Sequence, residues 1–221
     1  MLNNGSAENG ALRYFMTSNE NVQAQQPDDP SVYDSADDLL ILIDFQNVYL
    51  PGQPWACPTM EQAIENTLSI LRSPDHPDYV LTQYLPPADP VGRWKRYNEE
   101  YAEINADAFL SDFPESVRRI ITEDNLIVKD TYSSLKSANI KNALEGKKRV
   151  VLTGVVAECC VLATMMDAID LGYEVVYLYD CISGFTAENE KMIRTLAESF
   201  SHIHTRVMSS EAYKRLISAG Q

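Results

Sequence analysis

The chain has 221 residues, a formal net charge of −14, and a composition that is 45% hydrophobic and 23% charged. This length and composition are typical of a globular protein with one substantial core. The acidic excess argues against a nucleic-acid partner, because it supplies no basic surface to neutralise phosphates. No apolar run reaches the length of a membrane span, so we expect no membrane partner.

The N-terminal residues 1–35 are polar, rich in Asn, Gln and Ser, and include "QPDDP". Such a composition predicts a flexible arm, and residues 36–221 are expected to form a single domain. The arm has no basic start followed by an apolar stretch, which is what a secretory signal would require. We therefore expect a cytoplasmic protein.

Cysteine and histidine spacing gives little support for a metal site. The four cysteines contain no CxxC pair, and the chain has only three histidines. A disulfide scaffold is not expected in a chain of this length. His76 stands alone in a predicted loop, where a solvated histidine is the usual finding. We expect no metal and no cofactor.

Apolar runs predict six strands in chain order. Their expected ranges are 39–43, 78–85, 125–131, 148–155, 173–180 and 202–208. Helical periodicity alternates with them. The expected helices lie at 59–73, from about Gly92, at 134–147, 158–172, 186–200 and 209–220.

Several residues have the character of helix ends. Thr59 with Gln62 three residues on, and Thr186 with Asn189, have the spacing of N-terminal caps. Gly172 is a suitable residue after a helix end, because it tolerates the left-handed conformation. Residues 86–124 are predicted to begin as a loop and to become helical later.

Strands that alternate with helices predict an α/β fold: three layers, doubly wound, around a six-stranded, mainly parallel sheet. Ligands in such sheets bind beyond the carboxyl ends of the strands. Three features fall there in the sequence: Asp44, Lys129 and the turn at 155–160.

Each of these residues has a functional and a structural interpretation. Asp44 follows an apolar strand, so it is either part of a site or a cap for the next loop. Lys129 is either a solvated strand-end lysine or a cation that lowers the pKa of a nearby thiol. Cys160 lies at a helix start, where the dipole favours a thiolate, but buried cysteines that only pack are common. We expect Cys159 to pack, since adjacent helical side chains diverge by about 100°.

The segments "LLILIDFQNVY", "LIVKDTYSSL" and "LTGVVAECCVLATMMDAIDLGYEVVYLYD", in this order, resemble the isochorismatase-like cysteine hydrolase superfamily. That group includes nicotinamidases, ureide and biuret amidohydrolases and N-carbamoyl-sarcosine amidase. The resemblance covers about residues 39–208. It implies an isochorismatase-like hydrolase fold and a homodimer or homotetramer.

The resemblance also assigns a catalytic triad of Asp44, Lys129 and Cys160. Cys160 is chosen over its neighbour because family members place valine after the nucleophile, and Val161 follows Cys160. A cis peptide at 155–156 is implied, with the N–H groups of Val156 and Cys160 forming an oxyanion hole. The implied activity is hydrolysis of an amide, ureide or carbamoyl C–N bond in a small molecule through an acyl-thioester.

The chain departs from its relatives in ways that narrow the chemistry. Isochorismatases proper lack the nucleophilic cysteine, so Cys160 argues against vinyl-ether hydrolysis. The metal-binding histidines of nicotinamidases have no counterpart in "PGQPWACP" or "VLTQYLPPADP". We therefore expect metal-independent hydrolysis and a substrate other than nicotinamide.

Substrate-binding residues are predicted less directly. The candidates are Gln46, Trp94, Tyr97 and Tyr132, with Arg93 and Arg96 as the nearest cations for a carboxylate substrate. The aromatic residues of "VGRWKRYNEEY" either pack a helix onto the core or form a pocket wall or lid.

Two other functions compete with hydrolysis. The chain could be a catalytically idle family member that acts as a binding or assembly protein. A redox protein that uses the Cys159–Cys160 pair is a third possibility. The strained geometry of a disulfide between adjacent residues and the missing CxxC motif argue against it.

Overall fold

The computed structural model describes residues 33–200 and 202–220. Most of the predicted N-terminal arm, residues 1–32, lies outside the described residues. Tyr33 already belongs to the folded domain: its side chain is buried, and its hydroxyl donates a 2.7 Å hydrogen bond to Asp38. The ordered fold thus includes residues that the sequence assigned to the arm.

Six parallel strands form one sheet in the order β3-β2-β1-β4-β5-β6, which confirms the predicted fold class. The strands are β1 (Asp38–Ile43), β2 (Asp78–Tyr84), β3 (Leu126–Lys129), β4 (Arg149–Val155), β5 (Glu174–Ser183) and β6 (Thr205–Met208). The strand order reverses on either side of β1 and β4. This is the place where parallel sheets bind ligands at their carboxyl ends.

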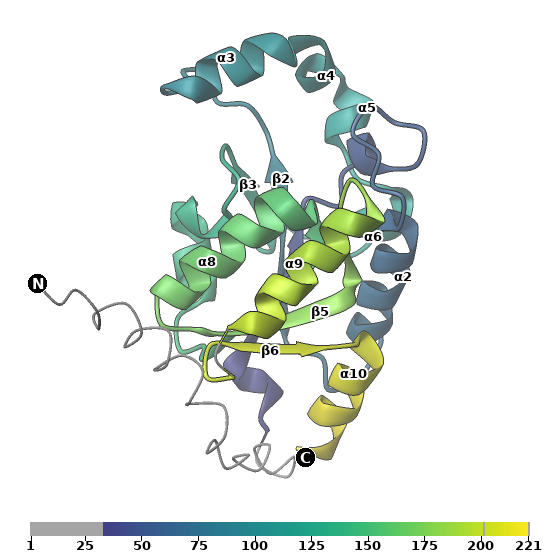
Figure 1. Cartoon of the computed structure of the whole chain (residues 1–221), viewed down its shortest axis with the longest axis vertical. Helices are drawn as coiled ribbons and strands as arrows, with labels where there is room; N and C mark the ends of the chain where they lie inside the picture. The colour runs from purple at the N-terminus through teal and green to yellow at the C-terminus, as the bar shows by residue number, and fades with distance from the viewer. Residues whose placement is uncertain (1–32, 201, 221) are drawn as a thin grey trace, which may run out of the picture.

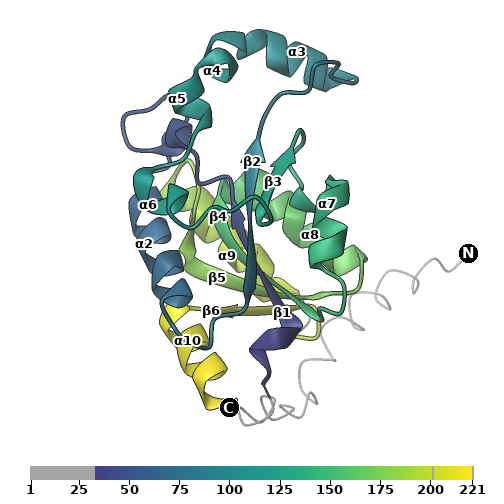
Figure 2. The same cartoon turned by 180° about the vertical axis from the view of Figure 1, so that it is seen from behind.

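The helices lie on both faces of the sheet (Figures 1 and 2). They are α2 (Met60–Leu71), α3 (Arg93–Glu100), α4 (Ala102–Ala106), α5 (Ala108–Ser111), α6 (Glu115–Arg118), α7 (Ala138–Ala143), α8 (Leu162–Asp170), α9 (Ala187–Ser199) and α10 (Ser210–Ala219). Helices α8 and α9 cross one face, and α2 and α10 cover the other. No helix among the described residues has both the length and the hydropathy needed to cross a membrane.

Strand β1 is buried along its whole length because both faces of the sheet are covered. Leu40 and Leu42 pack into the core beneath α2 and α10. Leu39, Ile41 and Ile43 point the other way, into the core beneath α7, α8 and α9. Successive side chains of this apolar run thus pack alternately into the two cores, one on each face of the sheet, as expected for a central parallel strand.

The segment after β2 leaves the sheet and returns through four short helices, α3 to α6. In Figure 1 helices α3 and α4 stand beyond the end of β2, away from the sheet. None of the residues of α3 or α4 is buried. This excursion places the aromatic side chains of α3 near the carboxyl edge of the sheet.

Local signals predicted the helix ends unevenly. The Thr186 cap is confirmed, since its hydroxyl accepts the Asn189 N–H, and Gly172 has a φ of +89°. Thr59 takes the predicted N-cap position before α2, but its hydroxyl makes no capping bond and instead bonds to Ser183 and Glu190. These partners come from distant segments, so tertiary contacts outcompete the local cap.

Three elements show clear differences from the sequence prediction. Strand β5 continues to Ser183, past the expected end at 180. The helix expected at 158–172 begins with a π-turn, Ala157–Val161, before α8. The predicted helix at 134–147 is divided into a 3-10 turn, Ser134–Lys136, and α7.

Candidate active site

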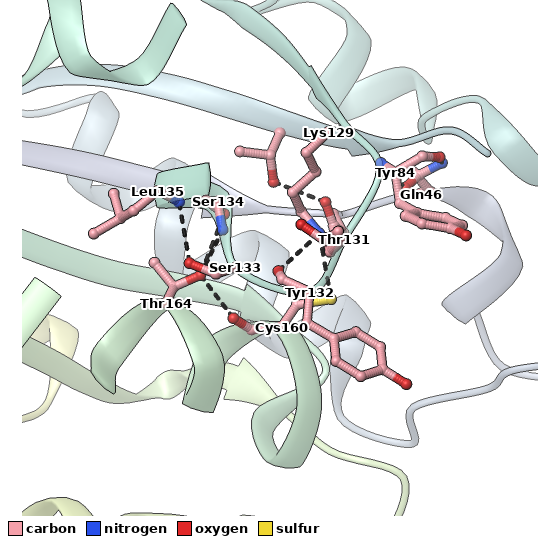
Figure 3. Close-up of polar contacts among 12 residues, drawn as sticks. Gln46, Tyr84, Lys129, Thr131, Tyr132, Ser133, Ser134, Leu135, Cys160 and Thr164 are labelled. Atoms are coloured by element: carbon pink, nitrogen blue, oxygen red, sulfur yellow. Dashed lines mark hydrogen bonds and ion pairs between the residues drawn. The ribbon is translucent and has the colours of Figure 1, made fainter. Parts of the chain in front are cut away.

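The carboxyl ends of β1, β3 and β4 bring Asp44, Lys129 and Cys160 together. Figure 3 shows Lys129 directed toward Cys160. Lys129 Nζ lies 2.7 Å from Asp44 Oδ2 and 3.4 Å from Cys160 Sγ. The Lys129 and Asp44 side chains are only 1% and 0% exposed. The three side chains that the sequence predicted as a group therefore form one buried cluster.

Asp44 is fixed by the neighbouring strand β2. Its φ of +51° is in the left-handed region, which Asp tolerates better than most residues. The Thr82 hydroxyl donates a 2.7 Å bond to Asp44 Oδ1, and the Asp44 N–H donates to the Thr82 carbonyl. This leaves Oδ2 directed to Lys129.

Lys129 is held by its own following loop. Its ammonium donates 3.0 Å bonds to the carbonyls of Thr131 and Tyr132 as well as contacting the two triad partners. Burial by itself would lower the pKa of this lysine, but its interactions with Asp44 and Cys160 outweigh burial and raise that pKa. The amine therefore stays protonated and compensates the buried carboxylate.

Cys160 is 4% exposed. Burial raises the pKa of its thiol well above the ordinary value, the Asp44 carboxylate raises it further, and Lys129 opposes both. The sequence suggested that the helix start and Lys129 would favour the thiolate. The structure instead favours a resting thiol, so a base is needed before the sulfur can attack.

The π-turn that carries Cys160 has an unusual hydrogen-bond pattern. The Val156 carbonyl accepts bonds from the N–H groups of Cys159 and Val161, and passes over that of Cys160. The peptide bond between Val155 and Val156 is cis. The backbone at this strand end is thus neither strand nor regular helix.

Thr164 connects the turn that carries Cys160 to the loop that follows Lys129. Its hydroxyl donates a 2.7 Å bond to the Cys160 carbonyl and accepts the Ser134 N–H at 3.0 Å. Figure 3 shows this bridge on the side of Cys160 opposite Tyr84. Because Thr164 is fully buried, the bridge is shielded from water.

A cavity of about 210 Å³ opens onto Cys160. Six of its nine lining residues are aromatic. The lining residues are Tyr49, Trp55, Tyr97, Tyr101, Tyr132, Val156, Cys159, Cys160 and Phe185. No charged side chain is among them, so the wall favours an uncharged, largely apolar ligand.

Several predicted site residues lie elsewhere. Gln46 is 2% exposed, and its amide bonds to the N–H and carbonyl of Tyr84 and to the carbonyl of Ser111. Its side chain therefore connects the segment after β1 to the end of β2 and does not line this cavity. Trp94 packs behind the wall, 4.9 Å from the Tyr132 ring and 5.2 Å from the Tyr97 ring.

The expectation for Cys159 is corrected. The sequence placed it away from the pocket because regular helical neighbours diverge by about 100°. In the structure it lines the same cavity as Cys160. The wider i→i+5 winding of the π-turn spreads successive side chains less than an α-helix does.

The sequence did not single out three wall residues: Tyr49, Trp55 and Phe185. Tyr49 and Trp55 lie in the segment after β1, and Phe185 follows the end of β5. Their shared signal is that aromatic residues follow carboxyl strand ends. Arg93 and Arg96 are exposed on α3 and do not line the cavity, so the structure gives them no role toward a carboxylate there.

Within residues 33–200 and 202–220, no group of three or more His, Cys, Asp or Glu side chains is arranged to hold a metal ion. His76, the histidine weighed from the sequence, bonds through Nδ1 to the Pro77 carbonyl and packs on Tyr79. The titratable side chains that meet beside the cavity are those of Asp44, Lys129 and Cys160.

Comparison with known proteins places this geometry in a family. The isochorismatase domain matches residues 38–210. The chain is 27% identical over 176 residues to the uncharacterised isochorismatase family protein YddQ of Bacillus subtilis, covering 77% of this chain and 89% of the relative. It is 25% identical to Nicotinamidase 3 of Arabidopsis thaliana over 176 residues, 74% of this chain and 82% of the relative.

The fold is also that of a solved cysteine hydrolase from Pseudomonas syringae pv. phaseolicola. The TM-score is 0.75 at 16% identity, over 88% of this chain and all of that one. Since the domain match spans most of the chain and the same fold recurs, the protein belongs to the isochorismatase family of hydrolases.

Proposed function

We propose that this protein hydrolyses an amide, ureide or carbamoyl C–N bond in a small molecule, without a metal, through a covalent cysteine intermediate. The observation that carries the proposal is the contact of Lys129 with both Asp44 and Cys160 beside an aromatic cavity. A thiol, a carboxylate and an ammonium within reach of one another supply a nucleophile, a base and a charge that holds the base.

The reaction begins with proton transfer from the Cys160 thiol to the Asp44 carboxylate. The sulfur attacks the carbonyl carbon of the substrate, which gives a tetrahedral oxyanion bound to sulfur. Asp44 returns the proton to the leaving nitrogen as the C–N bond breaks. Water then hydrolyses the thioester, releasing an acid and restoring the thiol. Lys129 stays protonated and keeps Asp44 in position.

The oxyanion is assigned to the N–H groups of Val156 and Cys160. The Cys160 N–H is passed over by the Val156 carbonyl, which supports its availability for a substrate oxygen. Backbone donors that are fixed before the reaction can stabilise developing charge without reorganising. The tyrosine and tryptophan side chains around the cavity, including Tyr97 and Tyr132, bind the remainder of the substrate.

The experiment is an ammonia-release screen over small amides, ureides and carbamoyl compounds with the purified protein. Hydrolysis should be lost in Cys160→Ala and retained, within about tenfold, in Cys159→Ala. The pair is matched, because both thiols line one cavity and differ in their contact with Lys129. If hydrolysis were lost in Cys159→Ala and retained in Cys160→Ala, Cys159 would be the nucleophile. If the parent hydrolysed no compound, a catalytically idle binding protein would be favoured.

The compartment and assembly belong to the same proposal. We expect a cytoplasmic homodimer or homotetramer that binds a small-molecule substrate. Sedimentation of the purified chain distinguishes these assemblies from a monomer, and a monomer would contradict the expectation.

A further inference from the structure

Glu158 connects the turn that carries Cys160 to the segment at the end of β5. It is the second residue of the π-turn Ala157–Val161. Its Oε1 atom accepts hydrogen bonds from the Phe185 N–H, at 3.2 Å, and from the side-chain amide of Asn189 on α9. Phe185 and Cys160 line the same cavity. One carboxylate therefore joins the turn of the nucleophile to a residue of the cavity wall.

A second carboxylate holds the end of β5 from another element. Glu190 of α9 accepts the Gly184 N–H and the Ser183 hydroxyl, both at 3.0 Å. The Thr59 hydroxyl donates to the same oxygen at 2.6 Å. None of these three donors belongs to the π-turn. Glu158 thus reaches the end of β5 from the turn of the nucleophile, whereas Glu190 reaches it from the helix that follows.

The fit between Glu158 and Gly184 is tight. The Glu158 Oε2 atom is buried and has no hydrogen-bond partner in the described part of the chain. A Cβ atom at Gly184 would lie 2.6 Å from this oxygen, which is closer than unbonded atoms normally approach. A buried acceptor without a partner costs free energy, so such a group needs a specific explanation. The bonds made by Oε1 keep the side chain in a place that does not satisfy its other oxygen.

The charge of Glu158 acts on one of the two cavity thiols. Burial raises the pKa of Cys159, Glu158 raises it further, and Lys129 opposes both. For Cys160, the groups that shift the pKa besides burial are Asp44 and Lys129. Any effect of Glu158 on the nucleophile therefore passes through the backbone of the π-turn and not through its charge.

We infer that Glu158 is a positioning residue of the active site. Its carboxylate fixes the π-turn against the segment that carries Phe185, so that the Cys160 N–H and the cavity wall keep one relative position. The inference rests on the proposed function and deepens it, because this N–H is the assigned oxyanion donor. Glu158 itself does not line the cavity. A displacement of about 1 Å at a reacting group can reduce a rate by about a hundredfold.

The first test uses a substrate identified in the ammonia-release screen. Glu158→Ala should lower kcat by about tenfold to a hundredfold, because both bonds of Oε1 are lost. Glu158→Gln keeps an oxygen that can accept both bonds and should recover most of that loss. Glu188→Ala is the matched control, since Glu188 is an exposed carboxylate beside Asn189, and it should leave kcat unchanged. A parent-like kcat in Glu158→Ala, or no recovery with glutamine, would overturn the inference.

The second test displaces the carboxylate without removing it. Gly184→Ala adds the Cβ atom that meets Glu158 Oε2. The next neighbours of this atom, Glu190 Cγ and Ala157 Cβ, lie at 3.2 and 3.3 Å, where small shifts suffice. The variant should therefore lower kcat as Glu158→Ala does. The double variant should lose no more than Glu158→Ala alone, because the clash with Oε2 is gone. Losses that multiply in the double variant would overturn the inference.

Alkylation separates this inference from the proposed function, because it needs no substrate. Iodoacetamide labelling of Cys159 and Cys160 near neutral pH is followed by tandem mass spectrometry. Both Glu158 variants should label Cys159 faster than the parent, since a charge that raises its pKa is removed. Only Glu158→Ala should also label Cys160 faster, because only this variant releases the turn. That pattern supports the inference even if no compound is hydrolysed, and a parent-like Cys160 rate in Glu158→Ala overturns it.

Discussion

Lys129 and Asp44 form an ion pair of 2.7 Å in which neither side chain is more than 1% exposed. Two charges removed from water are tolerable only when each compensates the other and the remaining polar atoms are bonded. Lys129 also donates to two loop carbonyls, and Asp44 accepts from Thr82. The pair therefore anchors three strand ends as well as the site.

Replacing Lys129 with methionine should reduce the free energy of unfolding by about 3–5 kcal/mol, because Asp44 is left buried and uncompensated. Urea denaturation measures the change. The control is Lys148→Met, since Lys148 pairs with Asp37 at 2.9 Å but is 71% exposed. An exposed pair contributes about 1 kcal/mol or less. Equal losses in the two variants would contradict the role of burial.

Replacing Asp44 with asparagine should separate thiol reactivity from turnover. The Asp44 charge raises the pKa of Cys160, and Lys129 opposes it, so Asp44→Asn should lower that pKa. Alkylation of Cys160 by iodoacetamide near neutral pH should then be as fast or faster. Amide hydrolysis should fall by about a hundredfold or more, because proton transfer is lost. Mass spectrometry locates the label. Slower alkylation in the variant would contradict the expectation that Asp44 raises the pKa of Cys160 but is needed for turnover.

Thr164→Val should destabilise the fold by about 1–3 kcal/mol, because the buried Ser134 N–H loses its acceptor. The substitution keeps the side chain's shape but removes the hydroxyl that also holds the Cys160 carbonyl. Thr164→Ser restores the hydroxyl and should recover most of the loss in urea denaturation. If serine is no better than valine, the bridge contributes little.

Gly154→Ala should prevent normal folding. Gly154 has a φ of +113°, and a Cβ there would lie 2.1 Å from the Ile43 carbonyl oxygen on the adjacent strand. Gly172→Ala is the matched control, because Gly172 also has a positive φ, +89°, but nothing lies within 4 Å of its Cβ position. Circular dichroism of the purified variants should show a native-like Gly172→Ala and an unfolded or insoluble Gly154→Ala. Similar spectra would contradict the packing argument.

Stability should decline in alkaline solution. Burial raises the pKa values of the Cys57, Cys160 and Cys181 thiols. Above about pH 8.5 thiols ionise in the unfolded chain but stay protonated in the fold, so the folded state binds more protons and loses stability as pH rises. In this pH range each such thiol lowers the free energy of unfolding by about 1.4 kcal/mol per pH unit.

Urea denaturation between pH 7 and 10 measures this decline. Cys57→Ala should have a shallower pH dependence than the parent, whatever its stability at pH 7, because one buried thiol is removed. A stability that stays constant from pH 8 to 10 would contradict the prediction.

The sequence alone determined the sheet and the edge at which chemistry gathers. The run at 39–43, apolar at every position, is typical of a strand covered on both faces, and alternation with helices predicts that such strands are parallel. Parallel strands end at one edge, so Asp44, Lys129 and the turn at 155–160 were expected along that edge. The strand order, which only the structure shows, brings them into contact.

Tertiary structure decided which residues form the wall of the cavity and how the Cys160 thiol is protonated. Tyr49, Trp55 and Phe185 reach one cavity from three segments whose side-chain directions no local pattern specifies. Cys159 also lines this cavity, because the turn that carries it is a π-turn. The Thr59 hydroxyl bonds to Ser183 and Glu190, from distant segments, and does not cap its own helix. The raised pKa of Cys160 likewise depends on burial, which arises only when all the strands and helices pack around the thiol.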